Sequence, residues 1–368
     1  MAPSVAFKNP HLKAALTKAA AVGAAAIVSG MPARANDTTV RGTPPAVAAD
    51  NGYYFWIDGT ADKIRLPAYQ LGLHNVSDVT AHDAGPIQRF DPRLDGGGFR
   101  GAIGYVVPAT TVKFELGGSY AAAKESLQLS SASNGLVGAR FLNGSGMVGI
   151  AFDCSFPATI GCTTAGNLNT EYTTWQLNGK VSADWQYGRV TVSPHLAVFG
   201  GNTRVGQTLS QSFAQPFSGN SGTYSASTTE NWTDIGARIG ADLSAEVAKT
   251  LTLDVGGWVG GASRYTSLSG HDVGADSTGN TVFGGGSTLS IDGSKTVLLA
   301  NAEAGFAYKP LQMVALRGFV GLNYDSRVPG IANPSFAGSF GAPTGTAASI
   351  FYAAETSYYA GGGLLMKW

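Results

Sequence analysis

The sequence predicts an all-β fold, a transmembrane antiparallel up-and-down β-barrel of about ten strands. Composition is the first observation: charged residues are only 13% of the 368 residues, about half their usual share, and the 51 glycines are about twice theirs. Second, apolar and polar residues alternate in run after run, yet beyond the N-terminal segment no stretch has the roughly 18 consecutive apolar residues of a spanning helix. Third, the connections between these runs are long and short in turn.

The first 35 residues have the order of a secretory signal peptide. Three lysines are followed by a short apolar core at 19–29, and Ala33-Arg34-Ala35 fits a cleavage site of small residues. This segment holds four of the 24 basic residues and none of the 24 acidic ones, so the remainder is net acidic and gives no support to nucleic-acid binding. The predicted organisation is a signal peptide at 1–35, a flexible leader at 36–51 and a barrel at 52–368.

The first strand is predicted at 52–59, where Tyr53 and Ile57 share one face and Trp56 and Asp58 share the other. Because alternate side chains of a strand point to opposite faces, one face suits lipid and the other a wet interior. The same alternation predicts further strands at 97–107, 111–124, 170–186, 190–200, 228–247, 251–266, 294–308, 313–325 and 350–368.

The predicted connections fall into two classes by length. The short ones are 108–110, 187–189, 248–250 and 309–312, and the long ones are 60–96, 125–169, 201–227, 267–293 and 326–349. Bacterial barrels have short periplasmic turns and longer extracellular loops, and an even number of strands leaves both termini in the periplasm. Ten strands satisfy this pattern, and an additional strand at 64–73 would raise the number to twelve.

The last eleven residues, 358–368, are predicted to belong to the closing strand, with Met366 and Trp368 on an apolar face and Lys367 on a mixed one. Together with the signal peptide and the amphipathic strands, this ending resembles the small bacterial outer-membrane β-barrel proteins, a porin-like superfamily, over 52–368. The features are generic and assign no single family. The resemblance implies a place in the cell outer membrane, contact with its lipid and lipopolysaccharide, and recognition of the C-terminal strand by the barrel-assembly machinery.

If the apolar register faces lipid, charged residues of both signs face the lumen. A barrel of about ten strands has a narrow interior, and opposite charges inside it tend to pair because an unpaired buried charge is costly. A salt-bridged, partly filled lumen and a narrow polar channel are both compatible with this pattern. The predicted lumen-lining residues are Arg100, Lys113, Glu115, Lys180, Asp184, Arg238, Asp242, Asp254, Glu303 and Arg317.

Porin-like passive passage of small polar solutes or ions is the leading functional prediction, with no enzyme activity and no cofactor or metal. The alternative is a closed barrel that acts through its loops as a surface interaction, adhesion or structural protein.

A third hypothesis is a hydrolase at the barrel rim. It would use His271 and Asp272 with Asp276, and a facing group of Asp78, His82 and Asp83. A solvated loop rich in Gly, Asp, His and Ser is the simpler explanation of these residues.

The two cysteines, Cys154 and Cys162, lie close together in the second long connection. In an exported chain such a pair predicts a disulfide that pins the loop. A metal site would need further ligands at suitable spacing, and no histidine is near in sequence.

Overall fold

The computed structural model describes residues 52–76, 83–133, 136–144, 147–153, 162–214, 221–276, 285–311, 313–334 and 346–367. The predicted signal peptide and leader, and Trp368, lie outside these ranges. Within the described ranges, no helix is long and apolar enough to cross a membrane.

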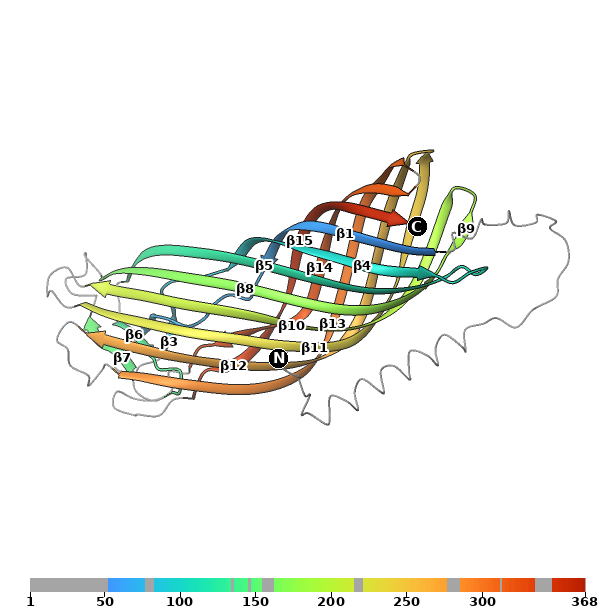
Figure 1. Cartoon of the computed structure of the whole chain (residues 1–368). Coiled ribbons are helices and arrows are strands. Elements are labelled where there is room, and N and C mark those ends of the chain that lie inside the picture. Colours follow the sequence, from blue (N-terminus) through green and yellow to red (C-terminus); the bar gives the residue numbers. More distant parts are fainter. Residues whose placement is uncertain are drawn as a thin grey trace, which may run out of the picture.

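Ten long antiparallel strands form a closed barrel (Figure 1). Neighbours in the ring follow the order of the chain, and the ring is complete because β15 pairs with β1 and β10 pairs with β11. The strands are β1 (Gly52–Arg65), β4 (Arg93–Val106), β5 (Val112–Ser133), β8 (Cys162–Ala183), β10 (Val190–Ala214), β11 (Ser221–Ala248), β12 (Leu251–Asp276), β13 (Gly285–Leu311), β14 (Val314–Ala332) and β15 (Ser349–Lys367), with a short strand β9 (Trp185–Tyr187) beside the start of β10.

The pairing register is staggered around the ring. Paired residues, followed once around the barrel, lead from Glu230 on β11 to Asp242 on the same strand, twelve residues further on. A stagger of this kind tilts the strands against the barrel axis. The barrel has ten strands and not twelve, because the chain leaves the wall after Arg65. The rest of the predicted strand at 64–73 makes only an isolated bridge, between Tyr69 and Phe90.

Two connections fold together into a small second sheet. It contains β2 (His74–Val76) and β3 (Asp83–Pro86) from the β1–β4 connection, and β6 (Leu136–Arg140) and β7 (Met147–Asp153) from the β5–β8 connection, in the order β3-β2-β6-β7. The sheet lies at the end of the barrel opposite the C-terminus, the left end in Figure 1. Parts of these two long connections therefore form regular structure at one mouth of the barrel.

Several strands are much longer than the sequence predicts. β10 to β13 have 25 to 28 residues each, whereas roughly 9–11 suffice to cross a membrane. The predicted connections 201–227 and 267–293 are wrong over most of their length, because strand continues to Ala214 and to Asp276. The outer faces of these strand ends are mostly polar, with Arg204, Thr208 and Ser210 on β10 and Ser267, Ser269 and His271 on β12. They therefore lack the continuous apolar exterior that predicted the other strands.

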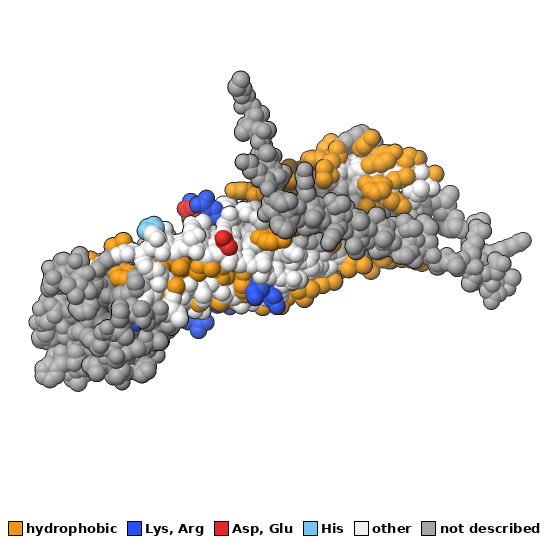
Figure 2. Space-filling model, turned by 90° about the horizontal axis from the view of Figure 1, so that it is seen from below, with side chains coloured by type: hydrophobic (Ala, Val, Ile, Leu, Met, Phe, Trp, Pro, Cys, Tyr) orange, Lys and Arg blue, Asp and Glu red, His pale blue; other side chains and the backbone are white. Residues whose placement is uncertain are grey.

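The outer surface changes along the barrel axis. In Figure 2, hydrophobic side chains gather towards one end, and charged side chains appear nearer the other. Exposed apolar side chains form the band near the short turns, including Ile57, Phe99, Ile103, Phe114, Leu116, Leu177, Ile239, Val255, Leu316 and Val320.

Beyond this band the exterior carries charged pairs, Lys63 with Asp95 at 3.0 Å and Lys124 with Glu171 at 2.6 Å. A closed barrel with an apolar outer band satisfies its backbone internally and suits lipid. The chain is therefore an outer-membrane β-barrel, and the long-loop end projects beyond the lipid. We call this projecting part the extracellular head.

Aromatic side chains lie at both borders of the apolar band. On the head side, the rings of Phe99 and Tyr120 stack at 5.7 Å, and Tyr120 is paired across the strands with Trp175. On the side of the short turns, the rings of Tyr53 and Tyr105 lie 4.9 Å apart. Aromatic girdles at the two interfaces are typical of outer-membrane barrels, so these rings indicate where the lipid begins and ends.

The interior of the head is a hydrophobic core. Inward-facing strand residues and folded-in connection residues contribute to it together, and most are fully buried. The strand residues are Cys162, Leu168, Leu209, Phe213, Tyr224, Ala226, Leu268 and Ile331, and the others are Tyr69, Leu71, Leu73, Phe90, Val137, Ala139, Phe141, Leu142 and Ala348. These side chains fill the extracellular mouth of the barrel.

Candidate functional site: the barrel lumen

All ten residues predicted to line the lumen lie on the inner face of the barrel, and most of them meet a residue of opposite charge there. The polar register of each strand brings them inward, because it alternates with the exposed apolar register. The lumen of the membrane-spanning part is therefore largely an internally paired set of charges.

The central cluster is built around the fully buried Asp58 of β1. Its carboxylate lies 3.1 Å from Arg100 Nε and 3.3 Å from Arg317 Nη1. Arg100 also contacts Glu303 at 2.6 Å, and Tyr359 donates a hydrogen bond to Glu303 at 2.8 Å. Arg100 on β4 and Glu303 on β13 are separated in the ring by β1, β15 and β14, so this ion pair crosses a large part of the bore.

A second cluster surrounds Glu115 on β5. Lys180 contacts its carboxylate at 3.0 Å, and Tyr54 and Trp56 each donate a hydrogen bond to it at 3.1 Å. Charge-assisted hydrogen bonds of this kind satisfy a buried carboxylate. Nearer the short turns, Lys113 pairs with Asp184.

Arg264 on β12 forms the most complete pair in the lumen. It donates to Asp234 in a bidentate manner, from Nε at 2.8 Å and from Nη2 at 2.6 Å. The same guanidinium donates to Asp325 at 2.7 and 3.2 Å and to the carbonyl of Arg327 at 2.6 Å. A buried arginine needs this number of acceptors to offset its lost hydration.

Arg238 differs from the other lumen arginines. Its Nη1 donates a hydrogen bond to Gln176 Oε1 at 3.3 Å. Its guanidinium carbon lies 4.6 Å from the ring centroid of Trp258 and 5.7 Å from that of Phe199. No carboxylate of the described residues lies within 4.0 Å of it.

Two further acids predicted for the lumen contact neutral or weakly basic groups. An oxygen of Asp242 is 3.4 Å from Nδ1 of His195. Asp254 accepts a hydrogen bond from Ser244 at 2.5 Å. The side chain of Asp242 is 49% exposed although it points inward, so the lumen beside it has room for solvent.

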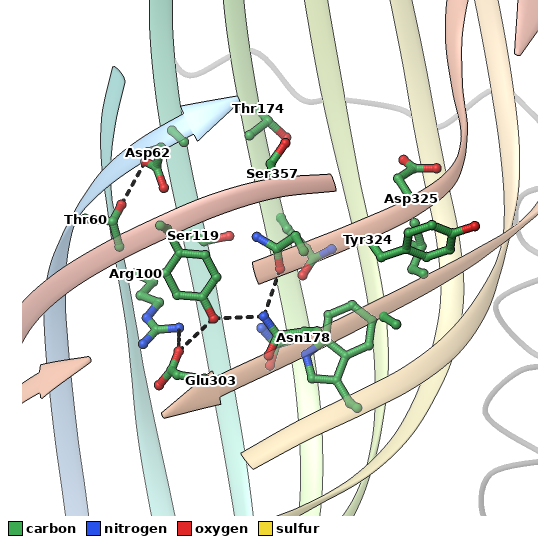
Figure 3. Close-up of a pocket in the computed structure, with 18 of the residues that line it drawn as sticks. Thr60, Asp62, Arg100, Ser119, Thr174, Asn178, Glu303, Tyr324, Asp325 and Ser357 are labelled. Carbon is green, nitrogen blue, oxygen red and sulfur yellow. Dashed lines mark hydrogen bonds and ion pairs between the residues drawn. The ribbon is translucent and has the colours of Figure 1, made fainter. Parts of the chain in front are cut away.

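A cavity of about 540 Å³ lies inside the barrel. Figure 3 shows its wall, with Arg100, Glu303, Ser119 and Asn178 pointing towards the space. The cavity extends from Ser244 and Asp254 to apolar residues beneath the head, namely Ile64, Leu66, Trp232 and Val328. It is therefore a polar space with an apolar roof.

The fully buried Asp272 anchors the second folded-in connection to the barrel wall. Its Oδ2 accepts hydrogen bonds from Leu142 N at 2.8 Å and from the Tyr224 hydroxyl at 3.1 Å. Its Oδ1 accepts from Ser287 N at 3.0 Å and Ser287 Oγ at 2.7 Å. Four donors satisfy this carboxylate and hold the connection inside the mouth.

Buried glutamines anchor the first folded-in connection. Leu73 N donates to Gln211 Oε1 at 2.7 Å, and Gln211 Nε2 donates to Gln88 Oε1 at 2.9 Å. Gly72 has a φ of +134°, and a Cβ there would lie 2.4 Å from Gln211 Oε1. Glycine is needed here both for the backbone conformation and for the close approach.

Glu230 is a buried acid in the wall below this core. Its neighbours across the strands are Val205 and Leu268, and no described cation lies within 4.0 Å of it. Burial raises the pKa of Glu230 to about 8, because desolvation penalises the charged carboxylate.

Of the rim-hydrolase residues, the two whose side chains the structure describes, His271 and Asp272, do not form one site. His271 is exposed on the outside of β12, whereas Asp272 points into the core and is fully engaged there. Adjacent strand residues face opposite sides, so the two side chains cannot cooperate. Asp78 and His82 lie outside the described residues, as do the side chains of Asp83 and Asp276.

The predicted disulfide involves one residue outside the described ranges, Cys154. Cys162 is fully buried in the head and is not a free thiol. The pairing stays a prediction. Among the described residues, no group of three or more His, Cys, Asp or Glu is arranged to hold a metal ion.

Several residues of the lumen and the mouth are not among the predicted site residues. Tyr359 and Asp325 lie on the inward registers of β15 and β14, and their alternation with exposed Tyr358 and Leu322 is the signal that could have found them. The anchors Gln88 and Gln211, with Asp272, give no such signal, because their partners are distant in sequence and come from folded-in connections.

No protein-family model matches this chain, and neither does any curated protein. Solved structures of outer-membrane barrels are similar at low scores. The outer membrane protease OmpT from Escherichia coli has 12% identity and a TM-score of 0.41, with 87% of this chain and 98% of that chain covered. The CymD monoaromatic hydrocarbon channel has 9% identity and a TM-score of 0.30, with 89% and 91% covered. Neisserial surface protein A has 11% identity and a TM-score of 0.25, with 86% and 97% covered. At these values no activity transfers to this chain.

Proposed function

We propose that this protein is a closed outer-membrane barrel that acts through its extracellular head, as a surface interaction or structural protein. The observation that carries the proposal is the hydrophobic core inside the mouth, where buried residues such as Leu73, Phe90 and Leu142 pack against inward-facing strand residues. Solute passage would require this core to open and its apolar surface to meet water, at roughly 25 cal/mol per Å² exposed.

The anchoring of both folded-in connections supports the same proposal. Asp272 and Gln211 hold them to the wall through buried hydrogen bonds, and breaking such bonds without replacement costs about 1–3 kcal/mol for each group left unsatisfied. The ion pair of Arg100 with Glu303 across the bore also narrows any path.

Porin-like passage remains the second candidate, because of one specific observation. The membrane-spanning part contains a polar cavity that solvent reaches near Asp242. If the head core opens, this cavity would become part of a narrow path whose charges set selectivity.

Single-channel conductance in a planar bilayer separates the two candidates. The folded full-length protein should give no discrete current steps, and strand-rich circular dichroism with heat-dependent gel migration should verify its folding. A positive control replaces 67–90 and 134–161 by short Gly/Ser linkers, which removes both folded-in connections and should produce steps. Salt-dependent steps from the unaltered protein would overturn the closed-barrel proposal and favour passage.

A further inference from the structure

The charge pattern around Arg238 points to a site for a ligand. Arg100, Arg264 and Arg317 each contact a carboxylate, but Arg238 has no such partner among the described residues. A guanidinium has five N–H donors, and the recorded hydrogen bond to Gln176 uses one of them. An arginine that lines a cavity with most of its donors available is suited to bind an anion.

The aromatic rings near Arg238 fix how it presents those donors. Its guanidinium lies close to the rings of Trp258 and Phe199. Packing against ring faces restricts the guanidinium and leaves its N–H edge available, which is the geometry that a carboxylate matches with two parallel hydrogen bonds. The amides of Gln176 and Asn178 line the same cavity and add further hydrogen-bonding groups.

The rest of the lining limits the charge of the ligand. Asp242 and Asp254, whose contacts are to His195 and Ser244, line the same cavity as Arg238. A second negative charge on the ligand would meet these carboxylates at close range, where like charges repel strongly in a medium of low dielectric constant. The cavity of about 540 Å³ is within the usual range for small-molecule sites, roughly 300–1,000 Å³.

The two ends of the cavity differ in polarity. Its far end is the apolar roof that contains Leu66 and Val328, whereas the inward-pointing side chain of Asp242 is half exposed. We propose that Arg238 anchors a binding site for a small organic monocarboxylate that enters from the periplasmic end. This site does not depend on whether the head opens.

Three probes of matched size test the proposal: butyrate, its neutral counterpart butyramide, and the dianion succinate. Each is titrated at constant ionic strength into the folded full-length protein in neutral detergent, and tryptophan fluorescence is recorded because Trp258 lies beside Arg238. Butyrate should bind saturably and at least about tenfold more tightly than butyramide or succinate, since butyramide cannot form the charge-assisted pair and succinate brings a second negative charge.

Arg238→Gln removes the charge and should reduce butyrate affinity to the level of butyramide. Arg238→Lys keeps the charge but loses the bidentate geometry. Its affinity for butyrate should therefore lie between those of the unaltered protein and of Arg238→Gln. The matched control is Arg204→Gln, which makes the same change at an exposed outer position of β10 and should leave binding unaltered. Heat-dependent gel migration verifies that each variant is folded. Equal affinities for butyrate and butyramide, undiminished binding by Arg238→Gln, or no saturable response of the unaltered protein would each overturn the proposal.

Discussion

The membrane-spanning part and the extracellular head are built from the same strands with opposite polarity. In the membrane, Leu116 and Val320 face outward and Glu115 and Asp58 face inward; in the head, Lys124 faces outward and apolar side chains fill the interior. The strand continues through the change without a break. The difference shows that the surrounding solvent decides which register is apolar, while the backbone stays the same.

The two interiors are also stabilised differently. The membrane part relies on paired charges and hydrogen bonds, whose net contribution is small when complete but whose disruption is costly. The head relies on apolar burial, as the core of a soluble protein does. Substitutions of matched chemistry in the two parts should therefore have different effects.

The largest effect is expected for Arg264→Ala, which removes a fully buried guanidinium and leaves the partly buried Asp234 and Asp325 without their partner. Removing one member of a buried ion pair costs about 3–5 kcal/mol. The measurement is the free energy of unfolding in urea from lipid vesicles. Arg204→Ala, at an exposed position, should change it by less than about 0.5 kcal/mol. Equal losses of unfolding free energy in the two variants would show that the lumen ion pairs contribute no more to stability than an exposed arginine does.

The next effect contrasts two leucines. Leu142→Ala empties a fully buried position in the head core and should cost about 2–5 kcal/mol. Leu316→Ala alters an exposed position of the apolar band, where the removed atoms are replaced by lipid, and should cost clearly less. The same urea titrations measure both. A larger loss for Leu316 would mean that the head is not packed as a core.

Glu230 should make the stability of the head depend on pH. Its pKa is raised from 4.5 in the unfolded chain to about 8 in the folded protein, so the folded state holds the proton more tightly. The stabilising contribution is complete below about pH 4.5 and is lost as pH rises through 8, by up to a few kcal/mol. Unfolding measured at pH 5, 7 and 9 should show this decline.

Glu230→Gln should flatten that pH profile, because the amide remains neutral throughout. The control Glu171→Gln makes the same change on the exterior and should keep the decline. A profile of Glu230→Gln that parallels the unaltered protein would rule out Glu230 as its source.

The smallest effect is expected at the exterior pair of Lys124 and Glu171, which is well exposed. Exposed ion pairs contribute little to stability and are screened by salt. A double-mutant cycle with Lys124→Ala and Glu171→Ala should give a small coupling energy at low salt and a smaller one at about 1 M salt. A large coupling energy that such salt does not reduce would place this level of the barrel in a medium of low dielectric constant, and so move the membrane border towards the head.

The alternation of apolar and polar residues by itself determined the fold class and the face of each lumen residue. It also placed the four short turns between strands. Period-two alternation is a local property, so Ile57 and Asp58 had to face opposite sides wherever the strand lay. The same local signal failed where lipid ends, because the strands up to Ala214 and Asp276 lack an apolar exterior.

Only the tertiary structure decided which charges meet and whether the mouth is filled. The partners of Asp58 come from strands far apart in sequence and are set by the stagger of the ring. Likewise, Leu142 and Leu73 are buried because Asp272 and Gln211 satisfy their backbone groups inside the mouth. These contacts depend on long-range geometry, which the alternation of a single strand does not contain.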